Sequence, residues 1–258
     1  MKKAAYAKIG IVAVVFALAA SLLTACSSQD DSDNYKLVKE DTLTVASSLD
    51  YPPFETTSDG TPSGYSVALA QEIANRLGLA CEVHNVEYGS IVSEVASGAN
   101  CDVAISSLAI TSEREGQVDF TDPYCIGEQA LVVLSGTYVT ADELQDRPVA
   151  AKEGTIGATY ARDQVSERVT TYKTTAECFD ALQAGTVRAV VVDYPVAKTV
   201  IAQGYSNCEI LERVATSEKY AIAVNKDNRT LTDAINKVLQ AMDEDGTLEN
   251  LQKQYLSS

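Results

Sequence analysis

The chain has 258 residues and a formal net charge of −16, because 36 acidic residues outnumber 20 basic ones. A surface this acidic disfavours binding to nucleic acid and to anionic lipid. With a single histidine and no CxxC or GxSxG spacing, the sequence gives little support to a metal site, a cofactor or triad catalysis.

Residues 1–25 have the pattern of an export signal. Lys2 and Lys3 precede an almost unbroken apolar run over 9–23, and small residues follow it. An uncleaved membrane anchor is the alternative, which the small residues and the cysteine at the end of the run disfavour. Leu-Thr-Ala-Cys at 23–26 resembles a bacterial lipobox, in which the cysteine is lipidated and becomes the new N-terminus.

Lipidation of Cys26 would determine where the protein resides. Acyl chains such as palmitate would anchor it to the extracytoplasmic face of the cell membrane without a spanning helix. Residues 26–40 are polar and acidic, with Asp30, Asp31 and Asp33 among small residues. Such a segment predicts a flexible tether between the lipid and the folded domain.

Strand and helix patterns alternate through the first part of the remaining chain. In the predicted helix over 66–77, Val67, Ala70 and Ala74 fall on one face, and Gly78 follows as a stop signal. The same kinds of pattern predict a helix over 90–97 and strands over 42–47, 81–86, 102–107 and 129–134.

A second alternating block follows, and the pattern then changes. The run over 189–192 is fully apolar, as expected for a strand covered on both faces. The block predicts strands over 149–151, 170–172, 189–192 and 208–211, and helices from 157, over 175–184 and over 195–203. A strand over 220–224 and two helices, over 231–242 and 248–255, complete the chain.

Repeated strand–helix units predict an α/β fold with parallel sheets covered by helices on both faces. The two blocks join near 125–130 and again near 218–222, which indicates two lobes with a two-segment hinge. We expect residues 41–127 plus 221–258 to form lobe 1 and residues 128–220 to form lobe 2.

Chemically active side chains follow the predicted strands. In open α/β sheets, ligands bind beyond the carboxyl ends of the strands. Cations, anions, aromatic rings and hydroxyls are all expected there, and this set fits a zwitterion whose side chain lies between aromatic faces. The residues are Ser48, Asp50, Tyr51, Tyr88, Ser106, Ser107, Arg114, Lys152, Thr155 and Asp193.

Seven segments stand in the order found in one known family. Over nearly all of residues 41–256, the chain resembles the bacterial amino-acid-binding proteins of ABC transporters, the family 3 solute-binding proteins with a type II periplasmic-binding-protein-like fold. The segments are SLDYPPFE, GYSVALAQEIANRLG, ISSLAITSERE, VDFTDPY, KEGTIG, VVVDYPVA and DGTLENLQKQY. The resemblance implies a monomeric, non-enzymatic protein whose two lobes close on a polar amino acid, or a derivative such as cystine, for delivery to a permease.

The resemblance assigns the first-lobe carboxylate site. Arg114 resembles the guanidinium that forks onto the ligand α-carboxylate; the alternative is a surface arginine paired with Glu113 or Glu115. Ala109 occupies a position often held by Ser or Thr, so its amide remains but a hydroxyl contact is lost. Ser107 resembles a ligand contact, whereas its neighbour Ser106 could equally cap a turn.

The second lobe supplies two further positions of the same kind. Thr155 resembles a carboxylate contact, with Gly154 and Gly157 letting backbone N–H groups approach the anion; an ordinary turn is the alternative. Asp193 resembles the carboxylate that pairs with the ligand ammonium, although it could be only a helix cap.

Four residues resemble the part of the family site that contacts the ligand side chain. Tyr51 and Tyr88 resemble the aromatic pair on either side of it, with a core role as the alternative. Members that bind basic amino acids often have Asp where Ser48 stands, which argues against lysine or arginine as ligand. Lys152 can reach the ligand side chain and favours a polar or acidic one, unless it is an exposed lysine.

Five cysteines follow Cys26, and they permit about 15 pairings of two disulfides. Proximity in sequence favours Cys81 with Cys101 and Cys178 with Cys208, which leaves Cys125 unpaired.

Two other functions are compatible with this fold. Some relatives are dehydratases that act on cyclic acids, and a turnover assay on prephenate or arogenate would detect such an activity. A ligand-sensing module is the second, and a neighbouring permease gene would favour transport over sensing.

Overall fold

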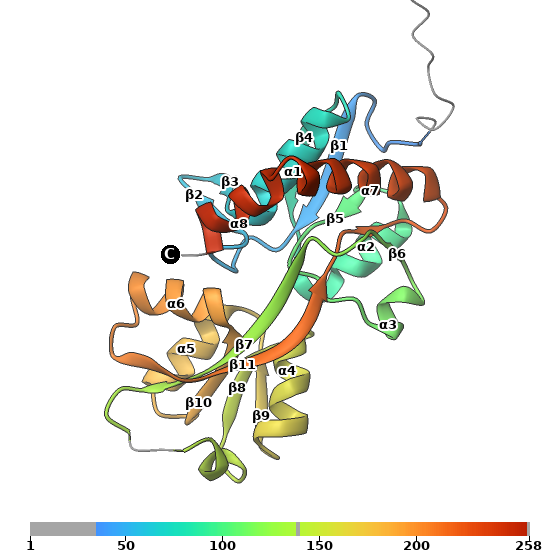
Figure 1. Cartoon of the computed structure of the whole chain (residues 1–258). Coiled ribbons are helices and arrows are strands. Elements are labelled where there is room, and N and C mark those ends of the chain that lie inside the picture. The colour runs from blue at the N-terminus through green and yellow to red at the C-terminus, as the bar shows by residue number, and fades with distance from the viewer. Residues whose placement is uncertain (1–34, 138–139, 257–258) are drawn as a thin grey trace, which may run out of the picture. The chain divides into compact units, whose positions relative to one another are not determined.

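Two five-stranded β-sheets, each covered by helices, dominate the part of the chain that the computed structural model describes, residues 35–137 and 140–256 (Figure 1). The predicted α/β class is confirmed. The predicted export signal, the lipidation site at Cys26 and most of the predicted tether lie outside the described residues.

The first sheet has the strand order β4-β1-β5-β12-β6. Strand β1 (Thr42–Ser47) is buried along its whole length because it pairs in parallel with a strand on each side. Its neighbours are β4 (Ala80–Asn85) and the short β5 (Val103–Ala104). Strands β12 (Ala223–Val224) and β6 (Asp119–Phe120) complete the sheet.

Helices α1, α2, α7 and α8 accompany this sheet, and we call sheet and helices together the first lobe. Val67, Ala70 and Ala74 are buried on one face of α1, as their spacing predicts, and Gly78 follows the helix with φ +73°. The helices span Tyr65–Arg76 (α1), Ile91–Ser97 (α2), Arg229–Glu244 (α7) and Thr247–Leu256 (α8).

The second sheet has the order β11-β7-β10-β8-β9 and, with its helices, forms the second lobe. Strand β10 is buried throughout, in agreement with its apolar sequence. The strands span Cys125–Leu134 (β7), Val149–Lys152 (β8), Val169–Tyr172 (β9), Ala189–Asp193 (β10) and Cys208–Tyr220 (β11). The helices span Ile156–Tyr160 (α4), Thr175–Gln183 (α5) and Tyr194–Gln203 (α6), and a π-helical turn over Ala161–Val165 extends α4.

Several short elements connect these parts. They include a hairpin, β2 and β3, that the sequence did not predict. The elements are β2 (Thr56–Ser58), β3 (Thr61–Ser63), α3 (Ser112–Glu115) and two 3-10 turns, η2 (Tyr88–Ser90) and η3 (Ala141–Leu144).

Strands β7 and β11 connect the two lobes. They pair antiparallel, with Cys125 opposite Tyr220 at one end and Leu134 opposite Cys208 at the other. Figure 1 shows both running from the second sheet toward the first. The sequence predicted two separate strands, over 208–211 and 220–224, whereas β11 is continuous with two register shifts. The predicted residue boundaries of the lobes stay predictions.

The prediction of purely parallel sheets is wrong in one respect. Strand β12 pairs antiparallel with β5 and β6, and β7 pairs antiparallel with β10 and β11. Both exceptions arise where the chain passes between lobes, because a strand that enters a sheet from the other lobe has no crossover helix to reverse its direction.

Neither predicted disulfide is present, since all five described cysteines are free. Cys81 lies opposite Leu43 on β1, and Cys101 precedes β5 on the other side of β1. Two strands that flank a third are about 9–10 Å apart, beyond the roughly 7 Å that a disulfide allows between Cα atoms. The thiol of Cys178 on α5 contacts the carbonyl of Thr174, and that of Cys208 contacts its neighbour Asn207.

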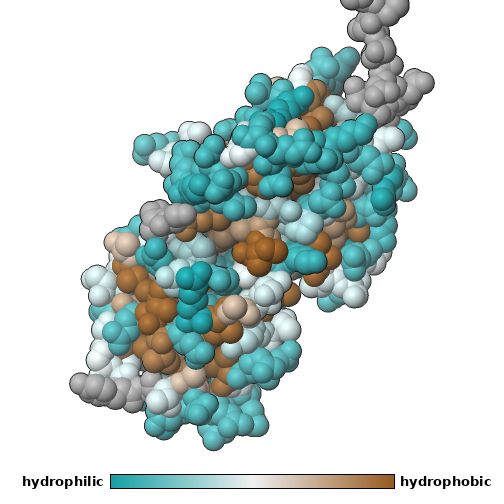
Figure 2. Space-filling view, viewed as in Figure 1, coloured by the Kyte–Doolittle hydropathy of each residue, from teal (hydrophilic) through white to brown (hydrophobic). Residues whose placement is uncertain are grey.

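The surface of the described residues is mixed in polarity. Figure 2 shows hydrophilic residues prevailing over α7, and hydrophobic ones gathered on the second lobe where α6 lies. No helix in residues 35–137 and 140–256 has the length and apolar composition needed to cross a bilayer.

Candidate functional site

Side chains from both lobes line one cavity. Most of them stand at or just after the carboxyl ends of strands β1, β4, β5, β8 and β10, as expected for a ligand site in such sheets, and Tyr220 is the last residue of β11. The lining residues are Tyr51, Tyr88, Ser106, Ser107, Lys152, Thr155, Ile156, Asp193 and Tyr220. Six of them were predicted as site residues, and Ser106 was named as the neighbour of the predicted contact Ser107.

Two serines form the part of the lining that follows β5. Strand β5 ends at Ala104, earlier than predicted, and Ser107 has φ +49°, a left-handed conformation that is uncommon without glycine. The hydroxyl of Ser106 accepts a hydrogen bond from the Ser48 amide at 3.0 Å, so Ser106 ties the end of β1 to this turn.

Glu55 lies beneath these serines, and the sequence did not predict it as a site residue. The hydroxyls of Ser106 and Ser107 donate to Glu55 Oε1 at 3.2 and 3.0 Å. Only 1% of the residue is exposed, and burial raises the pKa of Glu55 to about 8, against the opposing effect of the nearby serine hydroxyls and the charge of Lys152. The carboxyl group is therefore largely protonated at neutral pH, and it fixes two hydroxyls of the cavity wall.

This raised pKa predicts a distinctive pH dependence of stability. Because the folded carboxyl holds its proton up to about pH 8 while the unfolded one releases it near pH 4.5, the unfolding free energy should fall as pH rises through this window, by about 1.4 kcal/mol per unit. In Glu55→Gln this contribution is absent. The variant's stability relative to the parent should therefore rise from pH 5 to 8 and then level off.

Denaturant titrations of both proteins from pH 5 to 9 measure this difference. Glu249→Gln, at an exposed glutamate on α8, controls for the substitution itself. A difference between Glu55→Gln and the parent that stays constant with pH contradicts the raised pKa.

Arg114 on α3 contacts both lobes. Its guanidinium donates to the carbonyl of Ala109 at 2.8 Å, to the carbonyl of Gly154 at 2.9 Å and to the hydroxyl of Tyr88 at 3.2 Å. These partners replace the alternative in which Arg114 pairs with a neighbouring glutamate. A carboxylate among these groups would find a two-pronged donor with charge-assisted hydrogen bonds.

Thr155 lies where β8 turns into α4 and serves this turn. Its hydroxyl donates to the carbonyl of Lys152 at 2.7 Å and accepts from the amide of Ala158 at 3.2 Å. Thr155 thus stabilises an ordinary strand-to-helix turn, which was the alternative to a ligand contact. It also lines the cavity. Gly157 allows a close approach, because a Cβ there would lie 2.7 Å from Gln129 Oε1.

Asp193 ends β10 inside a buried polar cluster. Gln129 Nε2 donates to Asp193 Oδ1 at 2.6 Å, the Tyr220 hydroxyl donates to Oδ2 at 2.6 Å, and the Asp193 amide donates to the Tyr51 hydroxyl at 3.3 Å. Asp193 precedes α6, but its side chain makes no capping bond. Burial raises the pKa of Asp193 to about 7, with Glu218 adding to the rise and the hydroxyl and amide donors opposing it.

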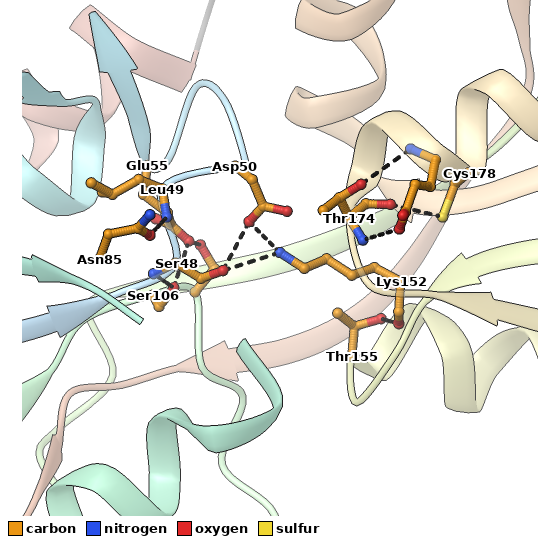
Figure 3. A network of polar contacts seen from close by, with 12 residues as sticks. Ser48, Leu49, Asp50, Glu55, Asn85, Ser106, Lys152, Thr155, Thr174 and Cys178 are labelled. Carbon is orange, nitrogen blue, oxygen red and sulfur yellow. Dashed lines mark hydrogen bonds and ion pairs between the residues drawn. The ribbon is translucent and has the colours of Figure 1, made fainter. Parts of the chain in front are cut away.

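Lys152 reaches from the end of β8 to the first lobe (Figure 3). Its ammonium donates to Asp50 Oδ1 at 2.5 Å and to Ser48 Oγ at 3.3 Å. The Lys152 side chain is only 3% exposed and that of Asp50 is 31% exposed. The alternative of an exposed surface lysine is therefore wrong.

Two tyrosines lie close to this ammonium. Lys152 Nζ lies 5.3 Å from the ring centroid of Tyr51 and 5.2 Å from that of Tyr88, within range of a cation–π interaction. Tyr51 is buried and stacks on Phe54. Both tyrosines line the cavity, so they serve the core and the site at once.

The structure thus brings all nine predicted ligand-site residues into one neighbourhood. Three of them lie outside the lining but are bonded to it. Ser48 accepts from Lys152, Arg114 donates to Tyr88, and Ala109 accepts from Arg114. The residues that sequence reasoning missed are Glu55, Gln129, Ile156, Tyr220 and Glu218, which has one unpartnered oxygen. The described residues include no group of histidine, cysteine and acidic side chains able to hold a metal ion.

Comparison with known proteins identifies the family. The model of the bacterial extracellular solute-binding proteins, family 3, matches residues 43–258. The chain belongs to this family. Among curated family relatives, the L-cystine-binding protein TcyJ of Escherichia coli (strain K12) is 28% identical over 260 residues, covering 98% of this chain and 97% of that protein.

Two further relatives bear on the fold and the ligand class. The arginine-binding extracellular protein ArtP of Bacillus subtilis (strain 168) is 28% identical over 243 residues, 91% of this chain and 92% of that protein. The solved structure of an ancestral arginine-binding protein bound to arginine is 32% identical with a TM-score of 0.76, covering 83% of this chain and 97% of that one. The predicted family and its two-lobe fold are confirmed.

Proposed function

We propose that this family 3 protein binds a polar amino acid outside the cytoplasm and delivers it to an ABC permease. The observation that carries the proposal is that Asp193 lines the cavity from one lobe while Arg114, from the other lobe, contacts the cavity wall through the hydroxyl of Tyr88. An α-amino acid presents a carboxylate and an ammonium on one carbon. A cation and a buried anion that come from different lobes match this pair of charges. The relatives named as cystine- and arginine-binding support the ligand class.

Binding follows from the same geometry. The ligand carboxylate accepts hydrogen bonds from the guanidinium of Arg114. It replaces the carbonyls of Ala109 and Gly154, which accept those bonds in the absence of ligand. The ligand ammonium pairs with Asp193, and the hydroxyl of Thr155 lies within the second-lobe wall. Because Arg114 and Asp193 belong to different lobes, one ligand that binds both residues joins the two lobes. Strands β7 and β11, which connect the lobes, provide the hinge.

The remaining features complete the proposal. Lipidation at Cys26 would keep the protein at the extracytoplasmic face of the cell membrane, and the acidic tether would let the folded domain reach its permease. The protein acts as a monomer and is not an enzyme. In support, the curated relatives above are named as binding proteins, and each is covered almost completely by this chain.

A thermal-shift and calorimetry panel of amino acids tests the function. An amino acid present at about 100 times its Kd should stabilise the folded protein by about 2.7 kcal/mol, which gives a readable increase in Tm. Prephenate and arogenate, assayed for turnover, cover the dehydratase alternative. Failure of every amino acid and amino-acid derivative to shift Tm or release heat contradicts the proposed function.

A further inference from the structure

Asp193 shares its buried polar cluster with a second acid, Glu218. Gln129 Nε2 donates to Asp193 Oδ1 at 2.6 Å and to Glu218 Oε2 at 3.2 Å, so one amide group joins the two carboxyl groups. The Tyr220 hydroxyl lies 2.6 Å from Asp193 Oδ2 and 3.3 Å from Glu218 Oε2. None of these four residues is more than 9% exposed. No ion pair among the described residues includes either acid, so the cluster holds two carboxyl groups without a cation from that part of the chain.

The two strands that connect the lobes are shaped around this cluster. Glu218 lies just after a register shift in β11, and the residue before it, Ser217, has the left-handed value of φ +57°. Gly127 lies opposite Glu218 on β7. A Cβ at Gly127 would lie 2.6 Å from Glu218 Oε2 and closer still to the Tyr220 hydroxyl. The irregular backbone of β11 and the absent side chain on β7 therefore make room for Glu218 beside Asp193.

Glu218 and Tyr220 act on the Asp193 carboxyl group in opposite directions. A negative charge on Glu218 disfavours a second negative charge beside it, whereas a hydroxyl that donates to a carboxylate stabilises the ionised form. Burial is the main cause that raises the pKa of Asp193 to about 7; Glu218 adds to the rise, and the bonds from Tyr220 and Gln129 oppose it. Tyr220 has one proton to donate, and its shorter bond directs this proton to Asp193.

Other titratable and charged groups surround Asp193. Burial raises the pKa of four of them, that of the thiol to about 12, so they stay neutral in the range where Asp193 ionises: Tyr51, Tyr88, Tyr220 and Cys125. Four charged residues line the cavity or a second hollow that Asp193 also borders: Glu128, Lys152, Lys198 and Arg213. None of these four bonds to the Asp193 carboxyl group. Among the described residues, Glu218 is therefore the charged group that shares its hydrogen-bond donors with Asp193.

We propose that Glu218 and Tyr220 are positioning residues on β11 that determine, in opposite directions, when the Asp193 carboxylate is available to the ligand ammonium. This inference rests on the proposed function, in which that ammonium pairs with Asp193. Glu218 favours the protonated form of Asp193, which releases its proton to solvent as the ammonium arrives. Tyr220 limits this effect, because its hydroxyl stabilises the carboxylate once it has formed. Ligand binding is thereby linked to the release of a proton.

Carboxyl titrations of the ligand-free protein test the two roles. ¹³C NMR of protein labelled at its aspartate carboxyl carbons follows Asp193, whose signal is the one that Asp193→Asn removes. The titration midpoint should fall by roughly one pH unit in Glu218→Gln, which removes a like charge, and rise by about one unit or more in Tyr220→Phe, which removes a donor to the ionised form. Both substitutions keep the size of the side chain. Entry of water into a loosened cluster would lower both midpoints, so shifts of opposite sign exclude a merely structural role.

Glu212→Gln is the matched control. Glu212 lies on the same strand as Glu218, but it is exposed and does not line the cavity. Its substitution should leave the Asp193 midpoint unchanged. The inference is overturned if Glu218→Gln also leaves the midpoint unchanged, or if Glu218→Gln and Tyr220→Phe shift it in the same direction.

Calorimetry with an amino acid that binds the parent extends the test to the ligand. From pH 8.5 to 5.5, the affinity of Glu218→Gln relative to the parent should rise by about five- to tenfold, because its Asp193 carboxyl group gives up the proton more readily. Simple damage to the site would weaken binding by the same factor at every pH. A ratio that stays constant with pH overturns the inference while the proposed function stands. Absence of binding by every amino acid overturns both proposals.

Discussion

Arg114→Met should weaken amino-acid binding by roughly 30- to 5,000-fold while the protein stays folded. Methionine keeps an unbranched apolar stem but removes every N–H donor and the charge. The ligand carboxylate would then bind without a guanidinium to pair with it. Leaving one member of a desolvated ion pair alone costs about 2–5 kcal/mol, which corresponds to this range of affinities.

Two companion variants make the Arg114 test specific. Arg114→Lys keeps the charge but loses the two-pronged guanidinium, so its affinity should lie between those of the parent and Arg114→Met. Arg213→Met removes an arginine that pairs with Glu128 and stacks on Tyr194, away from the cavity lining, and should leave affinity unchanged. Calorimetry with the best ligand measures all three. Parent-like affinity in Arg114→Met would refute the carboxylate assignment.

Much of the fold could be predicted because its strongest signals are local. The apolar stripe of α7 and the apolar run of β10 appear in the structure close to their predicted bounds. The errors occur where the geometry depends on distant partners. Strand β11 continues through charged residues, with Arg213 paired to Glu128 across 85 positions, because β7 supplies its hydrogen bonds over that length. No local pattern encodes that pairing.

The candidate site divides in the same way. Residues that directly follow strands could be found by position, since the carboxyl ends of parallel strands meet at one edge. Glu55 could not, because it lies in a loop and its serine partners are 51 and 52 positions away. Gln129 and Tyr220 belong to the crossing strands and reach Asp193 only because β7 and β11 pass beside β10. A buried acid without a local apolar pattern has no signal in one sequence.

The contacts between lobes also explain why affinity should depend on both walls. Arg114 with Gly154, Tyr51 with Asp193 and Lys152 with Asp50 each join a first-lobe group to a second-lobe group. A ligand that binds between the lobes must break such contacts. Its binding free energy therefore depends on whether it forms a new pair with every charged group whose partner it displaces. Among these groups, Asp193 depends most on a cationic partner for its ionised form, because it is buried and its pKa is raised.

Asp193→Asn should weaken amino-acid binding by roughly 10²-fold or more and remove a pH dependence that the parent shows. Burial raises the pKa of Asp193 to about 7. The ligand ammonium pairs only with the ionised carboxylate, so binding below pH 7 must first release a proton. The Kd of the parent should therefore increase as pH falls from 7 to 5.5, by up to about tenfold per unit, and stay level above pH 7.5.

The asparagine variant preserves the surroundings of the carboxylate. Its Oδ1 can still accept from Gln129, and its amide nitrogen can donate to the Tyr220 oxygen in place of the bond that Tyr220 now donates. Loss of affinity then reflects charge rather than a collapsed cluster, and an unchanged Tm at pH 6 checks this. Calorimetry of both proteins between pH 5.5 and 8.5 gives the two profiles. If the parent's Kd stays level, binding releases no proton, and if Asp193→Asn retains the parent's slope, the proton is released by another group. Either result contradicts the pairing of the ammonium with Asp193.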